Sequence, residues 1–415
     1  MLAVDEELRI PGDEGREYVI APRAEIKGTG GFAEVRVARC TTTDATVAVK
    51  IIKLRPVGKM DERTVLREVR IMRQASSAPH PNVIRVLDVH IARGDTRADL
   101  TRASPLGAAG TAYIVLELCN GGELFDRLTD FGRVPEPNAC HYMRGLLQGV
   151  AHLHERGVIH RDIKLENVLL SDDGTVKLAD FGLAAELAVD ASGAPINANA
   201  LLRDVVGSQS YVAPEVLVRK MKGYRGAPVD AWSCGVCLFT LLSGFFPLDV
   251  ADARDWRFRR LQAEQALGNL RACHVIFSMY QRDCPFSEAV QALLDGLLRV
   301  DPAQRMTVPD ALRTAWLQPG DDAKDEHGAF ESGAHGDGVV YRSFLGFGSF
   351  AAPAAPLAPE MLVPKRQAAH EASVLGQAAE RAGALASLSR AGVAAAALAV
   401  VAAVAAAALV ARRAR

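Results

Sequence analysis

The chain has almost no net charge and no long run of basic residues. Its 48 Lys and Arg residues nearly balance 49 Asp and Glu residues, so the formal net charge is −1. No long basic run appears before the extreme C-terminus, where residues 412–415 contain three arginines. Proteins that bind nucleic acid normally carry a basic patch or stripe that contacts the phosphates. The sequence therefore predicts no nucleic-acid partner.

Cysteine is also scarce, and the N-terminus lacks an apolar segment. Residues 1–17 are acidic, which argues against a signal peptide. Cys234 and Cys237 have C-x-x-C spacing but stand in an apolar stretch with no second pair to complete a zinc site. The odd number of cysteines favours reduced thiols in the cytosol over a disulfide framework. The seven are Cys40, Cys119, Cys140, Cys234, Cys237, Cys273 and Cys284.

The pattern of apolar residues divides the rest of the chain. Residues 18–118 alternate in the manner of strands, as at 34–39 and 46–51, around one amphipathic helix at 60–74. Residues 119–318 have helical spacing instead. The predicted helices there are 138–156, 229–242, 286–298 and 308–316.

Two segments have weaker patterns. Residues 91–112 form a polar insert that we expect to be a surface loop, and residues 319–391 are rich in Gly, Ala and Pro, as in a linker. The aromatic residues of 341–350 predict either cis docking onto the preceding domain or an ordinary sticky linker.

Residues 392–411 contain no charged or polar side chain. Twenty residues span about 30 Å as a helix, enough to cross a bilayer. The Val and Leu residues contribute about −2 to −4 kcal/mol to insertion. The sequence predicts a C-terminal transmembrane anchor, followed by the basic residues 412–415, and a cytosol-facing protein in an intracellular membrane. The alternative is an Ala-rich helix in a soluble cytoplasmic protein.

One short stretch combines residues suited to phosphoryl transfer. Asp162 can accept a proton from a hydroxyl, Lys164 can neutralise a phosphate, and Asn167 can bind a metal ion. Asp180 in Asp-Phe-Gly supplies a second metal-binding group. Transfer of a phosphoryl group from a metal–nucleotide complex depends mainly on such positioning and charge neutralisation.

A glycine-rich segment and a lysine precede this stretch. Residues 28–35 can bring backbone amides close to phosphate oxygens. A dinucleotide-binding loop is the alternative, but such a loop opens a helix, and a strand pattern follows here. Lys50 on a valine-rich strand needs an anionic partner. Nucleotide phosphates supply one, and Glu68 is the candidate second; an ordinary strand-end lysine is the alternative.

Together these motifs resemble the eukaryotic protein kinase family over about residues 18–317. Four further segments extend the resemblance: 80–83, 207–215, 230–235 and 301–305. The resemblance implies an α+β, bilobal fold, with a β-rich N-lobe containing one main helix and a helical C-lobe. It also implies ATP and Mg²⁺ as cofactors.

The family pattern assigns roles residue by residue. Asp162, Lys164, Lys50 and Glu68 correspond to catalytic positions, Asn167 and Asp180 to metal ligands, Glu215 and Arg305 to a structural brace, and Asp230 to a support for the catalytic loop. Ala33 departs from the family, which has a third glycine there. The ATP-binding positions are Gly28, Thr29, Gly30, Gly31, Phe32, Ala33, Val35, Ala48, Lys50, Glu117, Cys119 and Glu123.

The resemblance also suggests the substrate class. Lys164 and Ser208 occupy positions typical of serine/threonine kinases, so we expect Ser/Thr hydroxyls of proteins as acceptors. Glu123 and Glu166 match acidic positions that select upstream arginines, although either could be a solvated surface residue. The motif wording is closest to the calcium/calmodulin-dependent and checkpoint-kinase-like group, but no calmodulin-binding helix is indicated.

Regulation is suggested by an absence. Between Asp180 and Gly207 there is no Thr or Tyr, and Ser192 is the only Ser. Asp204 stands where related kinases carry a phosphothreonine, so it could pair with Arg161 and replace the phosphate. The alternative is that Asp204 is a solvated loop acid. A second functional class, a nucleotide-binding pseudokinase scaffold, is disfavoured because all the catalytic positions are occupied.

Overall fold

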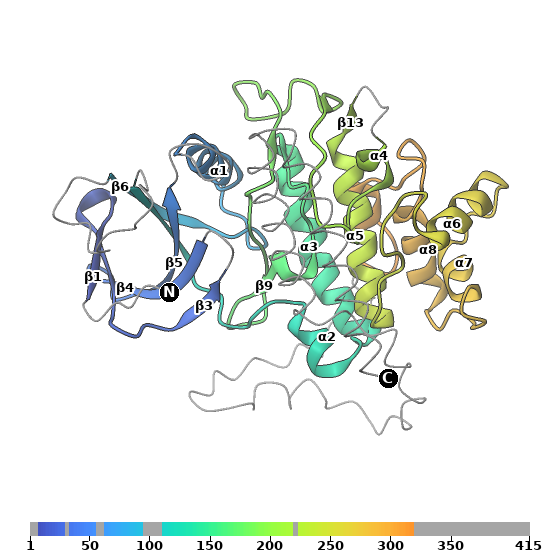
Figure 1. The fold of residues 1–415 in the computed structure, drawn as a ribbon, viewed down its shortest axis with the longest axis horizontal. Coiled ribbons are helices and arrows are strands. Elements are labelled where there is room, and N and C mark those ends of the chain that lie inside the picture. Colours follow the sequence, from blue (N-terminus) through green and yellow to red (C-terminus); the bar gives the residue numbers. More distant parts are fainter. Residues whose placement is uncertain (1–6, 30–32, 55–61, 94–109, 219–222, 319–415) are drawn as a thin grey trace, which may run out of the picture. The chain divides into compact units, whose positions relative to one another are not determined.

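The computed structural model describes residues 7–29, 33–54, 62–93, 110–218 and 223–318. Over these residues the N-terminal part is a seven-stranded sheet with one long helix, and the C-terminal part is mainly helical (Figure 1). The predicted bilobal α+β architecture is confirmed. The predicted linker and transmembrane segment lie outside the described residues.

The N-lobe sheet is antiparallel throughout and begins earlier than predicted. Leu8 and Ile10 of the first strand are buried with the core, whereas the prediction placed them in an acidic extension ending at residue 17. That prediction was wrong because the apolar alternation covers only four residues. The strand order is β1 (Leu8–Pro11), β2 (Glu17–Ile20), β4 (Ala33–Cys40), β5 (Thr46–Leu54), β7 (Gly110–Glu117), β6 (Val86–Arg93), with β3 (Ile26–Thr29) paired to β4.

The predicted loop at 91–112 is shorter at both ends. Ile91 pairs with Ala112 and Arg93 with Gly110, so β6 and β7 extend into it from either side. Residues 94–109 lie outside the described part of the chain. The strand ends were missed because small and polar residues replace the apolar alternation there.

Helix α1 (Glu62–Ala75) places a carboxylate inside the N-lobe. Val65, Val69 and Met72 are buried along one face, as predicted. Glu68 lies on that same face, because positions three and four apart are neighbours on a helix, and it is only 8% exposed. The helix therefore carries Glu68 inward, toward the sheet.

The C-lobe is built around two helices, α3 (Glu136–Glu155) and α5 (Gly226–Ser243), which pack against each other. Among the described residues α5 is long and apolar enough to cross a membrane, but 89% of it is buried, so it is a core helix. Cys234 and Cys237 are buried in it, as expected. The other helices are α2 (Asp126–Phe131), α4 (Pro214–Leu217), α6 (Trp256–Ala266), α7 (Ala272–Ser278), α8 (Glu288–Leu297) and α9 (Val308–Leu312).

Of these helices, α2, α4, α6 and α7 were not predicted, and α9 ends earlier than expected. Helix α6 buries only Phe258 and Leu261, so its sequence has little apolar periodicity. Its first turn is stabilised by Asp255, whose side chain accepts a hydrogen bond from the amide of Arg257.

Candidate active site

The segment from His160 to Asn167 lies between two short strands, β8 (Val158–Ile159) and β9 (Val168–Leu170). Asp230 on α5 is fully buried and holds the start of this segment. Its carboxylate accepts hydrogen bonds from the amides of His160, at 2.9 Å, and Arg161, at 2.8 Å. Burial raises the pKa of Asp230, but the hydrogen bond from His154 (2.8 Å) and nearby charge lower it by more. The buried carboxylate of Asp230 therefore fixes the backbone at the start of this loop, the supporting role that the family pattern implied.

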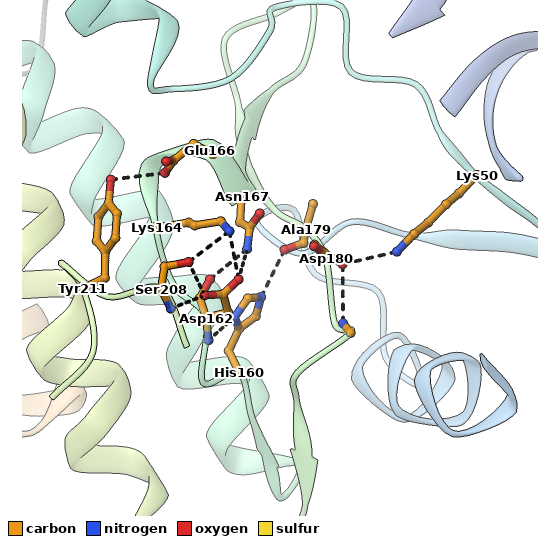
Figure 2. A network of polar contacts seen from close by, with 11 residues as sticks. Lys50, His160, Asp162, Lys164, Glu166, Asn167, Ala179, Asp180, Ser208 and Tyr211 are labelled. Atoms are coloured by element: carbon orange, nitrogen blue, oxygen red, sulfur yellow. Dashed lines mark hydrogen bonds and ion pairs between the residues drawn. The ribbon is translucent and has the colours of Figure 1, made fainter. Parts of the chain in front are cut away.

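The carboxylate of Asp162 is held by donors on both oxygens (Figure 2). Oδ1 accepts hydrogen bonds from the amide and the hydroxyl of Ser208, at 2.9 and 2.8 Å. Oδ2 lies 3.0 Å from Nζ of Lys164 and 3.2 Å from Nδ2 of Asn167. Asp162 is 8% exposed. The structure thus brings together four of the residues that the sequence singled out.

Lys164 is a cation at neutral pH. Burial lowers its pKa, but the charge of Asp162 raises it by more. Its Nζ also donates to Oγ of Ser208, at 3.1 Å. The lysine therefore links the catalytic loop to the segment that carries Ser208.

A second group centres on Lys50, whose side chain points toward Asp180 in Figure 2. Nζ of Lys50 is 2.7 Å from Oε1 of Glu68 and 3.2 Å from Oδ1 of Asp180. Burial lowers the pKa of Lys50, but the two carboxylates more than compensate and raise it above its usual value. Burial raises the pKa of Asp180, but the positive charge of Lys50 lowers it by more, so the pKa of Asp180 lies below its usual value.

Asn167 and Asp180 fit a magnesium ion bound together with a nucleotide. Nδ2 of Asn167 donates to the backbone oxygen of Asp162 (2.8 Å) and to its side chain, which leaves the amide oxygen as a metal ligand. The side chain of Asp180 is 49% exposed, and its backbone has a left-handed φ of 63°. Magnesium typically takes one or two carboxylates and completes its shell with phosphates and water.

The nucleotide-binding positions that are described lie on adjacent strands. In the sheet register Gly28 pairs with Val35, Val35 pairs with Lys50, and Ala48 pairs with Leu116. Ala33 begins β4, and nothing is described for Gly30, Gly31 and Phe32, which lie outside the described residues.

The last residue of β7 and the segment that follows it contain the other predicted adenine contacts. Burial raises the pKa of Cys119 to about 12, so its thiol is neutral. The side chain of Glu117 is bound by Lys177, with Nζ 2.9 Å from Oε2. Its backbone amide donates to the carbonyl of Arg85 at 3.1 Å, so Glu117 is held through both its side chain and its main chain.

The two candidate substrate glutamates lie in different settings. Oε2 of Glu166 accepts a hydrogen bond from the Tyr211 hydroxyl at 3.2 Å, and burial raises the pKa of Tyr211 well above its usual value. Glu123 forms an isolated bridge with Leu169. Both glutamates are partly buried.

Arg161 and Asp204 are in contact. Nη1 of Arg161 lies 3.1 Å from Oδ2 of Asp204, and its Nε donates to the carbonyl of Leu183 at 2.7 Å. The arginine side chain is 3% exposed and the aspartate side chain 69%. Gly207 follows with a φ of 113°, and a Cβ there would lie 2.9 Å from the carbonyl oxygen of Arg161, so only glycine fits.

Tyr224 belongs to this group, and the sequence did not single it out. Its hydroxyl donates to the backbone oxygen of Asp204 at 2.7 Å and lies 3.5 Å from Nη1 of Arg161. Strands β12 (Leu201–Leu202) and β13 (Tyr224–Arg225) pair and bring it there. No motif marks Tyr224, because the contact depends on pairing between segments far apart in the chain.

Three polar residues of α1 were also missed. Arg67 donates to the carbonyl of Ala184 (3.1 Å), Arg70 pairs with Glu186, and Gln74 donates to the carbonyl of Arg156 (2.6 Å). Together they hold α1 against the C-lobe and keep Glu68 beside Lys50. Their spacing along one helix face was the only available signal, and it also fits a solvated surface.

Comparison with known proteins identifies the family. The family described as "Protein kinase domain" matches residues 23–317. The chain belongs to this family. Its similar curated relatives are kinases: CBL-interacting serine/threonine-protein kinase 9 of Arabidopsis thaliana is 35% identical over 299 residues, and CBL-interacting protein kinase 33 of Oryza sativa subsp. japonica is 36% identical over 297 residues.

Each of these kinase alignments covers 71% of this chain but only 56% of the relative, so the match spans little more than half of each relative's length. The relatives are named for an interaction with CBL. The prediction that this kinase is closest to the calcium/calmodulin-dependent and checkpoint-kinase-like group was wrong. The residues of a few short motifs are shared too widely among protein kinases to distinguish one kinase group from another.

Proposed function

We propose that the chain is an ATP- and magnesium-dependent serine/threonine protein kinase that phosphorylates protein substrates. The observation that carries this proposal is the simultaneous placement of two groups: Asp162 with Lys164 and Ser208, and Lys50 with Glu68 and Asp180. The pseudokinase alternative requires that one of these groups be lost. The relatives, named as protein kinases, support the same activity.

Each described residue has a distinct task in this proposal. Bound Mg–ATP supplies the transferable phosphoryl group and neutralises its charge. Asp162 orients the acceptor hydroxyl and takes its proton. The hydroxyl of Ser208 and the ammonium of Lys164 hold the Asp162 carboxylate in place, and the acceptor hydroxyl can take over one of these hydrogen bonds. Lys164 offers a cation beside that oxygen. Lys50, which Glu68 keeps in place, binds the α- and β-phosphates of ATP.

The test is phosphate transfer from ATP to an arrayed peptide library. We expect Ser and Thr acceptors to be labelled and Tyr acceptors not to be. Glu123 and Glu166 predict selection of Arg a few residues before the acceptor. Nucleotide binding with no transfer to any peptide would favour the pseudokinase instead.

We propose further that Asp204 replaces activation-segment phosphorylation by pairing with the buried Arg161. Replacing Asp204 with Ala should lower kcat/KM by about three- to tenfold, because an ion pair with one exposed partner is worth on the order of 1 kcal/mol. Steady-state kinetics on phosphatase-treated protein would measure the change. Treatment alone should have no effect, because under this proposal activity requires no phosphate between Asp180 and Gly207, where Ser192 is the only hydroxyl-bearing side chain.

Asp190→Ala is the matched control, since Asp190 is an exposed acid of the same segment that bonds only to its own turn. Its kinetics should equal those of the parent. Equal rates for Asp204→Ala and the parent would show that the pairing has no role in activity.

For location, we propose that residues 392–411 anchor the kinase in an intracellular membrane with its catalytic domain in the cytosol. The support is the uninterrupted apolar composition of these residues, which lie outside the described part of the chain. The full chain should sediment with membranes and resist carbonate extraction, whereas a chain ending at residue 391 should be soluble and equally active. A full chain that stays in the supernatant would exclude the anchor.

The names of the relatives state an interaction with CBL. What this chain shares with them is the kinase domain at 23–317. We propose proteins with Ser or Thr acceptors as the partners of this kinase domain.

A further inference from the structure

A cavity of about 380 Å³ lies beside the end of β7, and none of the catalytic side chains described above lines it. Its walls come from the end of α1, the loop before β6, the end of β7 and strand β10 (Val176–Leu178). The volume is at the lower end of the range for small-molecule sites. The cavity is therefore large enough for a compact organic ligand, and Glu117 is the one lining residue that it shares with the nucleotide-binding positions named above.

The charged groups around the cavity leave one cation in excess. The carboxylate of Glu117 is satisfied, since it accepts hydrogen bonds from Nζ of Lys177 (2.9 and 3.1 Å) and from the amide of Arg85 (2.8 Å). The guanidinium of Arg85 is exposed at the cavity and has no ion pair within the part of the chain that the structure describes. Arg85 and Lys177 together thus outweigh Glu117 by one charge.

His80 does not add to this charge. Its Nδ1 accepts a hydrogen bond from the amide of Asn82 at 3.1 Å, and burial lowers its pKa, as does His152, whose ring centroid lies 4.5 Å away. The imidazole is neutral at physiological pH and offers a flat surface. The rest of the wall is formed by Ser76 and by the apolar residues Ala75, Pro79, Pro81 and Val83.

We propose that this cavity binds a small organic monocarboxylate. The carboxylate contacts the guanidinium of Arg85, which suits planar bidentate anions, and an aromatic or aliphatic body packs against the prolines and His80. The single negative charge of a monocarboxylate balances the one positive charge by which Arg85 and Lys177 exceed Glu117. A phosphate monoester carries nearly two at neutral pH and would place an uncompensated charge beside Glu117.

The position of the cavity connects it to the catalytic machinery. Glu117 ends β7, and Lys177 precedes Asp180 by three residues. The wall loop is joined to β10 by two backbone hydrogen bonds, Leu178 to Asn82 (2.9 Å) and Ile84 to Leu178 (3.0 Å). A ligand there contacts both the end of β7 and the strand leading to Asp180 without entering the nucleotide cleft, so both ligands bind at once.

The test uses phenylacetate and its neutral isostere phenylacetamide, titrated into the full chain by calorimetry or ligand-observed NMR. We expect phenylacetate to bind at least about tenfold more tightly than phenylacetamide or phenyl phosphate. Arg85→Ala should remove that preference. Arg282→Ala, which changes an exposed arginine of the C-lobe, should leave it intact. Binding should persist with a saturating non-hydrolysable ATP analogue.

Four results would overturn the proposal. They are no binding of phenylacetate up to about 10 mM, equal affinity for the acid and the amide, an affinity unchanged by Arg85→Ala, and displacement by the ATP analogue. Tighter binding of phenyl phosphate would replace the monocarboxylate with a phosphate ligand and so contradict the charge argument. All readouts are of binding, so kinase activity does not enter them.

Discussion

Replacing Asp162 with Asn is expected to lower kcat for peptide phosphorylation by about 10²- to 10⁴-fold, the range that a positioned general base contributes. Asparagine has the same shape but cannot take the proton of the acceptor hydroxyl. Its amide nitrogen replaces one of the two oxygens, so its hydrogens oppose either the Ser208 hydroxyl at Oδ1 or the Lys164 ammonium at Oδ2. Steady-state kinetics with a Ser peptide would measure the loss.

ATP binding separates this chemical defect from a structural one. Asp162 does not contact Lys50, so the Asp162→Asn variant should bind ATP within about twofold of the parent. Asp172→Asn, at an exposed position a few residues beyond Asn167, should retain full activity. If Asp162→Asn kept the parent rate, the residue would not act as the base and the proposed division of roles would be wrong.

Replacing Arg305 with Met should destabilise the C-lobe by about 3–5 kcal/mol, the usual cost of leaving a buried charge without its partner. The guanidinium is fully buried and makes two hydrogen bonds to Glu215, at 2.6 and 2.9 Å. It also donates to the backbone oxygens of Arg299 and Pro228 and lies 5.1 Å from the Trp232 ring. Urea denaturation monitored by Trp fluorescence would report the change in the free energy of unfolding.

A surface pair provides the control. Arg313 also pairs with an acid, Asp310, but its side chain is 69% exposed, so Arg313→Met should cost less than about 1 kcal/mol. Adding Glu215→Gln to Arg305→Met should recover part of the loss, because the stranded buried charge is then removed. Similar losses for Arg305→Met and Arg313→Met would show that burial does not govern the strength of these pairs.

Much of the site could be predicted because phosphoryl transfer requires particular groups in a short stretch. Asp162, Lys164 and Asn167 lie within six residues, so the chain itself keeps them close. Lys50 and Glu68 were predictable as a pair because a buried lysine needs an anion and α1 carries one on its apolar face. Helices α3 and α8 were predictable from apolar residues at helical spacing, and α5 from its almost continuous apolar sequence, which are also local signals.

Other features were not predictable, because their signals are short or non-local. Strand β1 has only four residues, and helix α6 buries only two side chains, so neither stands out from a polar background. Tyr224 joins Arg161 and Asp204 only through the pairing of β12 with β13. Arg67 and Gln74 have the spacing of a solvated helix face and acquire a role only when α1 meets the C-lobe.

The sequence by itself determined the family and the chemistry, since the groups that handle the proton, the metal and the phosphates are specified by residue type and spacing along the chain. Only the tertiary structure decided how these groups are held. It buries Asp230 beneath the catalytic loop, brings Asp204 to Arg161, and joins Lys50 to Asp180 across 130 residues. Such contacts depend on which surfaces pack together, and no local pattern encodes the partner of a side chain that lies on another element.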